Sequence, residues 1–576
     1  MLIHRRGPSP GRPGLGPYPP RRVRPLVIVA ASVAVLAMTG PAASAATTTT
    51  TAAGGGTSTT TTTTAPSSSS GSSWTVYHGD PAGSGVATPV AGVNTTRRAW
   101  TSPALDGELY GEPLVSGDLV YVATEDDTVY ALSSTSGAVV WSARLGTPVP
   151  SSMLPCGDIT PDVGITGTPV IDPARSELFV VADELVDGAP AHRLVGLDAT
   201  TGRVELTQGV DPTGSIPSNI LQRTGLTLDD GQVVFGFGGN DGDCARYRGW
   251  VVAVAEGGGT PSDFAVDSGR DESQGAVWMG GGAPAVDTAG HIWVGVGNGS
   301  VTSSSHAYDD SDSVLELSSS LALLQYFAPS SWATNNANDL DMSTVPALLS
   351  DGQVLEAGKS RIAYLLDAGH LGGIGGEETS LATGCPEDID GGVAYVGTTV
   401  YLPCLAGIMA VKVTPSPAGL RVLWSSGTGG GPPIVAGGLV WTIGQDGTLY
   451  GLDPTTGAVR QSASIGSEAN HFPTPSVGDG LLLAPTADSV VAFTASPVAT
   501  TPTTNATATA PTTTTTTTTA PMNLGSDAGS SSGGGLSDGN VAAIVIGGIL
   551  AVAFVGAALL GRRRRRNRRS EPPSLG

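Results

Sequence analysis

The stretch that decides the fold is GEPLVSGDLVYVATEDDTVYALSSTSGAVVW, residues 111–141. It contains short apolar runs separated by turn-forming residues, and within each run Val, Leu and Tyr alternate with small or polar residues. This alternation is typical of half-buried β-strands. The stretch therefore predicts one small antiparallel sheet of four strands. Such a sheet cannot bury both of its faces alone, so it needs neighbours of its own kind.

Similar stretches recur along the chain at intervals of about fifty residues, which is the spacing of an internal repeat. The further copies begin at Gly167, Thr224, Gly282, Pro346, Gly391, Pro432 and Pro473. Together with the first stretch they make eight units, and four-stranded repeats of this length are typical of β-propellers. The predicted fold class is all-β: an eight-bladed β-propeller of four-stranded antiparallel blades, with an N-terminal signal peptide and one C-terminal transmembrane helix.

The last copy stops after three strands, and an isolated strand-like segment near the start, RRAW at residues 97–100, has no partner strands before it. It ends in Trp100, as other blades end in Trp141 and Trp424. We predict that this segment completes the final blade and closes the ring, which leaves no open sheet edge between the chain ends. We expect the tryptophans to pack between adjacent blades, with each indole N–H bonded to a carbonyl.

The two ends of the chain differ from the repeats in composition. We predict a signal peptide at 1–45, a Thr/Ser-rich linker at 46–73, the propeller at 74–496, a second linker at 497–540, a transmembrane helix at 541–561 and a basic tail at 562–576. The N-terminus has six arginines, an apolar run from Leu26 to Met38 and small residues at 43–45. An uncleaved membrane anchor is the alternative interpretation of this segment.

The predicted transmembrane helix contains twenty residues without a charge, Val541 to Leu560, and seven arginines follow it. By the positive-inside rule this end is cytoplasmic. The sequence thus predicts a single-pass protein of the cell membrane with an extracellular propeller. The Thr-rich linkers and the high Gly and Ala content indicate an actinobacterial type of cell envelope.

The predicted extracellular part is strongly acidic, with 15 basic and 49 acidic residues. Such a surface repels nucleic acid, so we exclude it as a partner. The expected partners are the membrane, through the single C-terminal span, and an extracellular protein or small-molecule ligand whose identity the sequence does not show.

Four cysteines in an exported domain predict two disulfides. Cys156 and Cys385 each precede the first strand of a blade, whereas Cys244 and Cys404 each follow a second strand. In an up-and-down meander these loops lie on the same face of the ring. Because Cys385 and Cys404 share one blade and the other two belong to adjacent blades, we predict the pairs Cys156–Cys244 and Cys385–Cys404.

The repeats resemble the pyrroloquinoline-quinone (PQQ) repeat of the quinoprotein alcohol dehydrogenases, through runs such as LVGLDATTGRV and LYGLDPTTGAV. The resemblance covers residues 74–494 and is most specific at QYFAP (325–329), NDLD (338–341) and Gly358–Lys359. It implies that Lys359 lies close to a bound quinone and that Asn298 is a ligand of the cofactor's Ca²⁺. The resemblance thus implies PQQ and Ca²⁺ as cofactors, although no cofactor is predicted from the residues themselves.

The chain also departs from that family. No two cysteines are adjacent, Asp243–Cys244 stands where a calcium-ligand glutamate is expected, and Ser318 stands where the resemblance places the catalytic aspartate. Since serine at its ordinary pKa cannot act as the carboxylate base, no catalytic residue is predicted. Asp339 and Asp341 are candidate metal ligands.

Two further groups of polar residues are interpreted as structural. Asp309, Asp310 and Asp312 are interpreted as a solvated acidic turn in preference to a Ca²⁺ site. The scattered histidines are interpreted as structural or surface residues.

The leading functional hypothesis is a non-enzymatic binding or scaffold propeller at the cell surface, as in the outer-membrane assembly propeller of the wider family. The alternative is a PQQ- or metal-dependent oxidoreductase with altered catalytic residues. A hydrolase or lyase with a triad assembled only in three dimensions is a third hypothesis.

Overall fold

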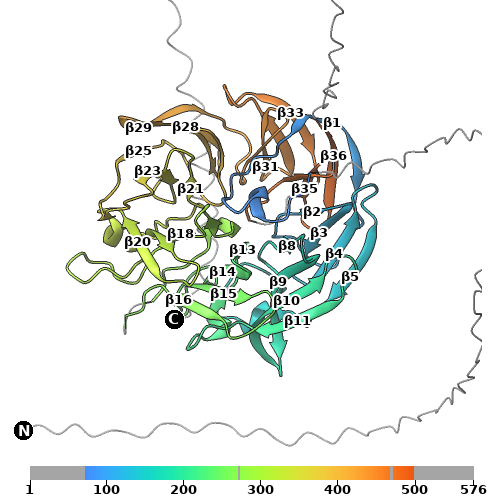
Figure 1. The fold of residues 1–576 in the computed structure, drawn as a ribbon, viewed down its shortest axis with the longest axis horizontal. Helices are drawn as coiled ribbons and strands as arrows, with labels where there is room; N and C mark the ends of the chain where they lie inside the picture. The colour runs from blue at the N-terminus through green and yellow to red at the C-terminus, as the bar shows by residue number, and fades with distance from the viewer. Residues whose placement is uncertain (1–71, 270–272, 468–470, 498–576) are drawn as a thin grey trace, which may run out of the picture. The chain divides into compact units, whose positions relative to one another are not determined.

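Each repeat folds into one antiparallel sheet, and the eight sheets follow one another around a ring (Figure 1). A computed structural model of the chain describes residues 72–269, 273–467 and 471–497. The predicted signal peptide, transmembrane helix and basic tail lie outside the described residues, as does nearly all of each linker. No helix in the described ranges is both long and apolar enough to cross a membrane.

In the first seven blades the strands pair in chain order from the inside of the ring outward, and in the eighth the first strand of the chain, β1, is added outside β36. Within each blade these four strands are antiparallel to their neighbours. The first four blades are formed by β2 (Leu114–Ser116), β3 (Leu119–Ala123), β4 (Thr128–Ser133) and β5 (Val139–Arg144); β8 (Val170–Asp172), β9 (Glu177–Val186), β10 (Ala189–Asp198) and β11 (Val204–Gly209); β13 (Thr227–Asp229), β14 (Gln232–Gly239), β15 (Trp250–Ala255) and β16 (Ser262–Ala265); and β17 (Ala285–Val286), β18 (Ile292–Val296), β19 (Ser313–Leu317) and β20 (Leu323–Ala328). The next four are formed by β21 (Ala347–Leu348), β22 (Gln353–Glu356), β23 (Ile362–Asp367) and β25 (Thr379–Ala382); β26 (Ala394–Val396), β27 (Thr399–Cys404), β28 (Gly407–Pro415) and β29 (Ala418–Ser425); β30 (Ile434–Ala436), β31 (Leu439–Gly444), β32 (Thr448–Leu452) and β33 (Val459–Ser464); and β34 (Ser476–Gly478), β35 (Leu481–Pro485), β36 (Val490–Pro497) and β1 (Val90–Thr101).

Short elements decorate this ring. They are the strands β6 (Val149–Pro150), β7 (Asp162–Val163), β12 (Ile220–Leu221) and β24 (Gly373–Ile374), the 3₁₀ turns η1 (Tyr77–Gly79), η2 (Ser151–Met153), η3 (Pro217–Asn219) and η4 (Met279–Gly281), and the helix α1 (Trp332–Asn336). The core lies between the blades, where fully buried Val, Leu, Ile and Phe side chains of the second and third strands pack against the neighbouring sheet. The predicted all-β propeller of eight four-stranded blades is confirmed.

The ring closes between the two ends of the propeller. The first strand in the chain, β1, pairs with the last, β36, and Trp100 lies opposite Ala492. The segment at residues 97–100 therefore completes the final blade, as the sequence predicts. Its pairing covers the edge of β36 that would otherwise be exposed.

Three tryptophans link adjacent blades in the same way. Trp100, Trp141 and Trp424 donate their indole N–H groups to the carbonyl oxygens of Ser134, Ala199 and Pro454, at 2.6, 3.2 and 3.0 Å. Each carbonyl belongs to the turn between the third and fourth strands of the next blade. The predicted role of these tryptophans, packing between blades with a bonded N–H, is confirmed.

The N-terminal part of the propeller fills its central channel. The backbone of Ser72 accepts a hydrogen bond from Asp479, in the turn between β34 and β35, and the chain then reaches η1 at the centre of the ring (Figure 1, blue). There the Tyr77 hydroxyl lies 3.4 Å from Thr474 Oγ1 and accepts from Gly392 N at 3.2 Å. Both of these residues lie just before inner strands, so the plug closes the channel beneath the loops that enter those strands.

Candidate functional site

Two adjoining cavities lie on one face of the ring, where the loops before the inner strands meet the loops between second and third strands. They share Asp241, Trp278 and Lys359, and their volumes are about 170 and 520 Å³. We call them the funnel. The smaller cavity is also lined by Tyr110, Asp158, Ile159, Leu221, Arg223, Gly239, Gly280, Ser343, Asp390, His471 and Phe472, and the larger by Gly242, Asp243, Gln274, Asn298, Gly299, Ser300, Thr302, Asn336, Ala337, Asn338 and Asp339.

Lys359 is the centre of a charged cluster between the two cavities. Its Nζ lies 2.5 Å from Asp341 Oδ2 and 3.4 Å from Asp339 Oδ1. The other oxygen of Asp341, Oδ1, accepts a hydrogen bond from the backbone N–H of Asn298 at 2.7 Å. The structure thus brings together all four predicted site residues: Asn298 follows β18, the aspartates lie between α1 and β21, and Lys359 follows β22.

The side-chain amide of Asn298 faces the carboxylates of Asp339 and Asp341. With its nitrogen turned toward them it donates to both carboxylates, at 3.2 Å to Asp339 Oδ1. With its oxygen turned toward them, the amide of Asn298 adds an oxygen donor to those of the two carboxylates. Asp243 lines the same cavity. Carboxylate and amide oxygens are the donors that hard cations such as Ca²⁺ require. The chemistry of this donor set therefore fits a hard cation.

The charges of the cluster shift the pKa values of its members. Burial by itself lowers the pKa of Lys359, but the charge and hydrogen bond of Asp341, together with Asp339, raise it above the ordinary lysine value. Burial raises the pKa of Asp390 to about 6, against the opposing effects of its hydrogen bond from Ser343 and the charge of Lys359. Lys359 is therefore a permanent cation, whereas Asp390 gains its negative charge near pH 6.

A second charged group lies across the smaller cavity. Arg223 is buried, donates to the backbone oxygen of His471 at 2.9 Å and places its guanidinium carbon 5.5 Å from the centre of the Tyr110 ring. The imidazole Nε2 of His471 lies 2.7 Å from Asp158 Oδ2, and this hydrogen bond raises the pKa of His471. Arg223 thus donates one hydrogen bond to a neutral carbonyl and lies over an aromatic ring, and within the described residues it forms no ion pair with a carboxylate.

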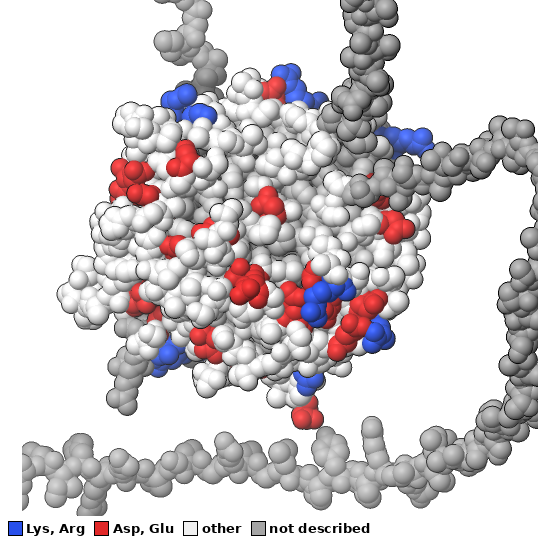
Figure 2. Space-filling view, viewed as in Figure 1, with Lys and Arg blue, Asp and Glu red and all other residues white. Residues whose placement is uncertain are grey.

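PQQ is a tricarboxylate, so a site for it needs cations that are free to bind carboxylates. In the funnel Lys359 is paired with Asp341, and Asp158, Asp241 and Asp390 line the same cavity as Arg223, so the carboxylates outnumber the cations there. Acidic side chains also form several patches on the face in view (Figure 2). The residues present therefore fit a hard cation, but they do not fit an unaccompanied tricarboxylate.

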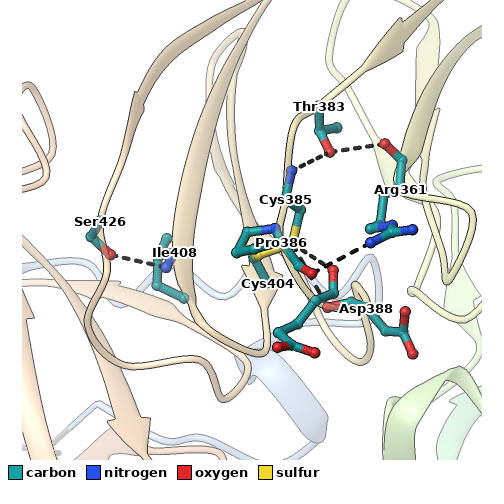
Figure 3. The surroundings of a disulfide bond; sticks show 9 residues. Arg361, Thr383, Cys385, Pro386, Asp388, Cys404, Ile408 and Ser426 are labelled. Atoms are coloured by element: carbon teal, nitrogen blue, oxygen red, sulfur yellow. Dashed lines mark hydrogen bonds between the residues drawn. A yellow bond between two sulfur atoms is a disulfide. The ribbon is translucent and has the colours of Figure 1, made fainter. Parts of the chain in front are cut away.

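Both predicted disulfides are present. Cys156 and Cys244 lie on the rim of the funnel, with Cα atoms 6.2 Å apart, and join the loop that leads to the second blade with a loop of the third. Cys385 lies in the connection that leads to the sixth blade and Cys404 ends its second strand, β27, with Cα atoms 5.9 Å apart. Figure 3 shows how the backbone N–H of Cys385 donates to Thr383, whose hydroxyl donates to the carbonyl of Arg361.

Two sequence-based interpretations need correction. Ser318 lies in the turn between β19 and β20, where its hydroxyl accepts from Ala322 N at 3.1 Å, and it lines neither cavity. Its identity therefore says nothing about the chemistry of the funnel, where Asp339 and Asp341 supply carboxylates. Asp309 and Asp312 are 2% and 0% exposed, so the predicted solvated turn is wrong.

Several funnel residues were not singled out from the sequence. Trp278, Arg223 and Asp390 come from three different blade connections, and no motif joins them. Their positions in the repeats could have identified them, because each lies before an inner strand, on the same face of the ring as Lys359.

The comparisons with known proteins agree with this fold. Residues 90–255 match the family model described as outer membrane protein assembly factor BamB. The chain is an eight-bladed β-propeller, and this family model matches part of it. No curated protein sequence matches the chain significantly.

Among solved structures, the propeller is similar to quinohemoprotein alcohol dehydrogenase from Comamonas testosteroni, with 15% identity and a TM-score of 0.55 over 73% of this chain and 80% of that one. The quinohemoprotein alcohol dehydrogenase ADHIIG from Pseudomonas putida HK5 has 14% identity and a TM-score of 0.54 over 74% and 81% of the two chains. A europium-containing methanol dehydrogenase has 15% identity and a TM-score of 0.53 over 73% and 98%. At these identities the likeness concerns the fold alone.

Proposed function

We propose that this propeller is a cell-surface binding module of the PQQ-repeat family whose funnel holds a hard cation and, beside it, a small polar ligand. The observation that carries the proposal is the convergence of Asn298, Asp339 and Asp341 next to Lys359 at the junction of the two cavities. Three oxygen donors around one point can replace part of the hydration shell of a di- or trivalent cation.

The size and lining of the smaller cavity limit the ligand. Its volume of about 170 Å³ lies below the roughly 300–1,000 Å³ of pockets that take drug-sized molecules. Tyr110, Trp278 and Phe472 offer aromatic surface, while the excess of carboxylates disfavours an anion that arrives without a cation. A small neutral or cationic molecule, or one that binds through the metal, suits this cavity.

Lanthanide luminescence tests the cation site. Tb³⁺ binds the same hard oxygen donors as Ca²⁺, and Trp278 lines the cavity that contains the donors, so excitation of the indole should sensitise its emission. We expect Ca²⁺ to compete with Tb³⁺ and the double variant D339N/D341N to lose most of the sensitised emission. The exposed Asp263→Asn is the matched control. Equal emission from the wild type and the double variant would overturn the proposal.

A quinoprotein-type oxidoreductase is the second candidate function. It is favoured by Asp339, whose carboxylate is 66% exposed beside Lys359 at the cavity, where it can accept a proton. The test is reduction of an electron-accepting dye by an alcohol after incubation with PQQ and Ca²⁺ or Eu³⁺. Turnover that disappears in Asp339→Asn would establish this candidate and displace the purely binding role.

We also propose that the propeller is exported and anchored by residues 541–561. The support is the uncharged run at 541–560 followed by seven arginines. Deletion of residues 541–576 should release the propeller into the culture medium, while the full chain stays with the membrane fraction. Equal release of both forms would overturn the anchoring.

A further inference from the structure

A second group of polar side chains lies in the fourth blade, at strand ends opposite the funnel. Asp287 and His291 flank the tight turn between β17 and β18, and Glu316 lies on β19, paired with Trp293. One donor atom from each of the three side chains lies within 4.8 Å of the other two. In the described ranges this is the one group of three such ligands within that distance.

The imidazole of His291 lies between the two carboxylates. Its Nδ1 is 2.6 Å from Glu316 Oε1 and 3.5 Å from Asp287 Oδ2. The His291 side chain is 36% exposed, whereas that of Glu316 is 6% exposed. A buried carboxylate and a partly buried carboxylate thus point at one nitrogen of a partly exposed imidazole.

Surrounding hydrogen bonds fix the orientation of both carboxylates. Asp287 Oδ1 accepts from the backbone N–H groups of Ala289 and His291 at 2.8 and 2.9 Å, and Asp287 Oδ2 accepts from the Trp293 indole at 3.2 Å. Glu316 Oε2 accepts from Gln325 Nε2 at 2.5 Å, which leaves Oε1 facing His291. Outer partners of this kind hold ligand side chains in place at metal centres.

A fourth carboxylate approaches the same turn from the third blade. Asp229 Oδ1 lies 3.3 Å from the position that a Cβ on Gly290 would occupy, inside the turn between Asp287 and His291. Asp229 is 9% exposed, and its Oδ2 is buried with no hydrogen-bond partner in the described part of the chain. An unpartnered buried oxygen of this kind is costly unless another group satisfies it.

We propose that Asp287, His291 and Glu316 form a binding site for a divalent first-row transition metal such as Zn²⁺, with Asp229 as a fourth or outer ligand. One imidazole nitrogen with two or three carboxylate oxygens is a donor set that suits Zn²⁺ better than Ca²⁺ or Mg²⁺. The metal would connect the turn between the first two strands of the fourth blade to the third strand of that blade. It would also bind Asp229 of the third blade. The site is separate from the funnel and does not rest on its proposed function.

Metal binding requires only a small rearrangement. Tetrahedral Zn²⁺ with bonds of 2.0–2.1 Å separates its ligand atoms by about 3.3 Å. The distance from His291 Nδ1 to Asp287 Oδ2 is already close to this value. The distance from His291 Nδ1 to Glu316 Oε1 is shorter than this value. Because His291 is partly exposed, its ring can move outward to admit the ion. Since a metal binds imidazole through an unprotonated nitrogen, binding at Nδ1 should weaken at acidic pH.

The test is a titration of the full chain with Zn²⁺ by calorimetry and with Co²⁺ by visible absorption, near pH 7.5. We expect one site that is lost, with Kd raised at least about 100-fold, in His291→Ala and in the nearly isosteric Glu316→Gln. His370→Ala is the matched control, because His370 is exposed and follows an aspartate, Asp367, by three residues. D339N/D341N should keep this site, which separates it from the funnel.

A second readout covers variants that fold poorly. Zn²⁺ should raise the melting temperature of the wild type and His370→Ala but not that of Glu316→Gln, whose far-ultraviolet circular dichroism should match the wild type. Failure of the wild type to bind Zn²⁺ or Co²⁺ stoichiometrically would overturn the proposal. Unchanged binding in both His291→Ala and Glu316→Gln would also overturn it.

Discussion

A Cβ atom on Gly202 would lie 2.4 Å from Cε3 of Trp141, because the indole of one blade lies flat against the turn of the next. Gly202 also has φ of +72°, a conformation that glycine adopts without strain. The same arrangement recurs at Gly137 with Trp100 and at Gly457 with Trp424. Each pair holds two adjacent blades together.

Gly202→Ala should therefore destabilise the propeller through both backbone strain and the clash with Trp141. We expect a loss of about 3 kcal/mol in the free energy of unfolding, measured by urea denaturation. Gly188→Ala is the control, since Gly188 has φ of +83° but no atom within 4 Å of its Cβ position. It should cost only the strain, about 1 kcal/mol. Equal losses in both variants would show that the tryptophan contact contributes nothing.

The two disulfides should differ in their resistance to reduction. Cys244 is exposed on the rim of the funnel, whereas Cys385 and Cys404 are 4% and 2% exposed. A thiolate reductant must reach a sulfur atom to attack it, so the Cys156–Cys244 bond should open first. Alkylation and peptide mapping after mild dithiothreitol treatment measures this order. Loss of Cys385–Cys404 before Cys156–Cys244 would contradict the assigned burial.

The stability of the propeller should depend on pH through Asp127. Asp127 is fully buried in the turn between β3 and β4, and burial, with the nearby charges of Asp183 and Glu184, raises its pKa to about 9. The ordinary value is near 3.9, so the folded state holds this proton more tightly than the unfolded state. Stability contributed by the protonated form is present at low pH and lost as pH rises from about 4 to about 9.

Asp127→Asn should remove this loss of stability at high pH. The turn should be kept, because Asn also tolerates the φ of +56° found there. Its melting temperature should exceed that of the wild type by several degrees at pH 9, with a smaller difference at pH 5. The exposed Asp118→Asn serves as the control and should follow the wild type at both values. Parallel melting curves for Asp127→Asn and wild type across this range would show that Asp127 ionises normally.

Cation binding in the funnel should strengthen as Asp390 ionises. Its pKa of about 6 means that it gains a negative charge between pH 5 and 7, close to Lys359. We expect the affinity for Tb³⁺ to rise several-fold over that interval. The variant Asp390→Asn should bind Tb³⁺ more weakly than the wild type at pH 7. Its affinity should not rise near pH 6. An unchanged step in this variant would assign it to another group.

The fold was predictable because each blade carries its own alternation of apolar and polar residues. The register of those repeats also placed the cysteines, and Trp100 marked the closing strand. All of these are local sequence patterns that can be read by comparing one repeat with the next. The central plug around Tyr77 was not predicted, since its short segment has no periodicity and gains its structure only from the inner strands around it.

The candidate sites were harder to predict because their residues meet only in three dimensions. Asn298, Asp339, Asp341 and Lys359 were found through the resemblance. Ser318 lies in the outer turn of its blade and lines neither cavity of the funnel, which its position in the sequence did not show. The buried Asp309 accepts a hydrogen bond from Ser311 of the same loop, and the buried Asp312 accepts one from Asn335 of α1, a contact that exists only in the folded chain.

The positions of the two ends of the propeller keep the face that contains the funnel accessible. Ser72 bonds to the turn between β34 and β35, and Pro497 ends the third strand of the same blade, so both ends leave by the side of the ring away from the funnel. A tether at either end would therefore attach on the face opposite the funnel. A ligand that enters the funnel would not meet the attachment point.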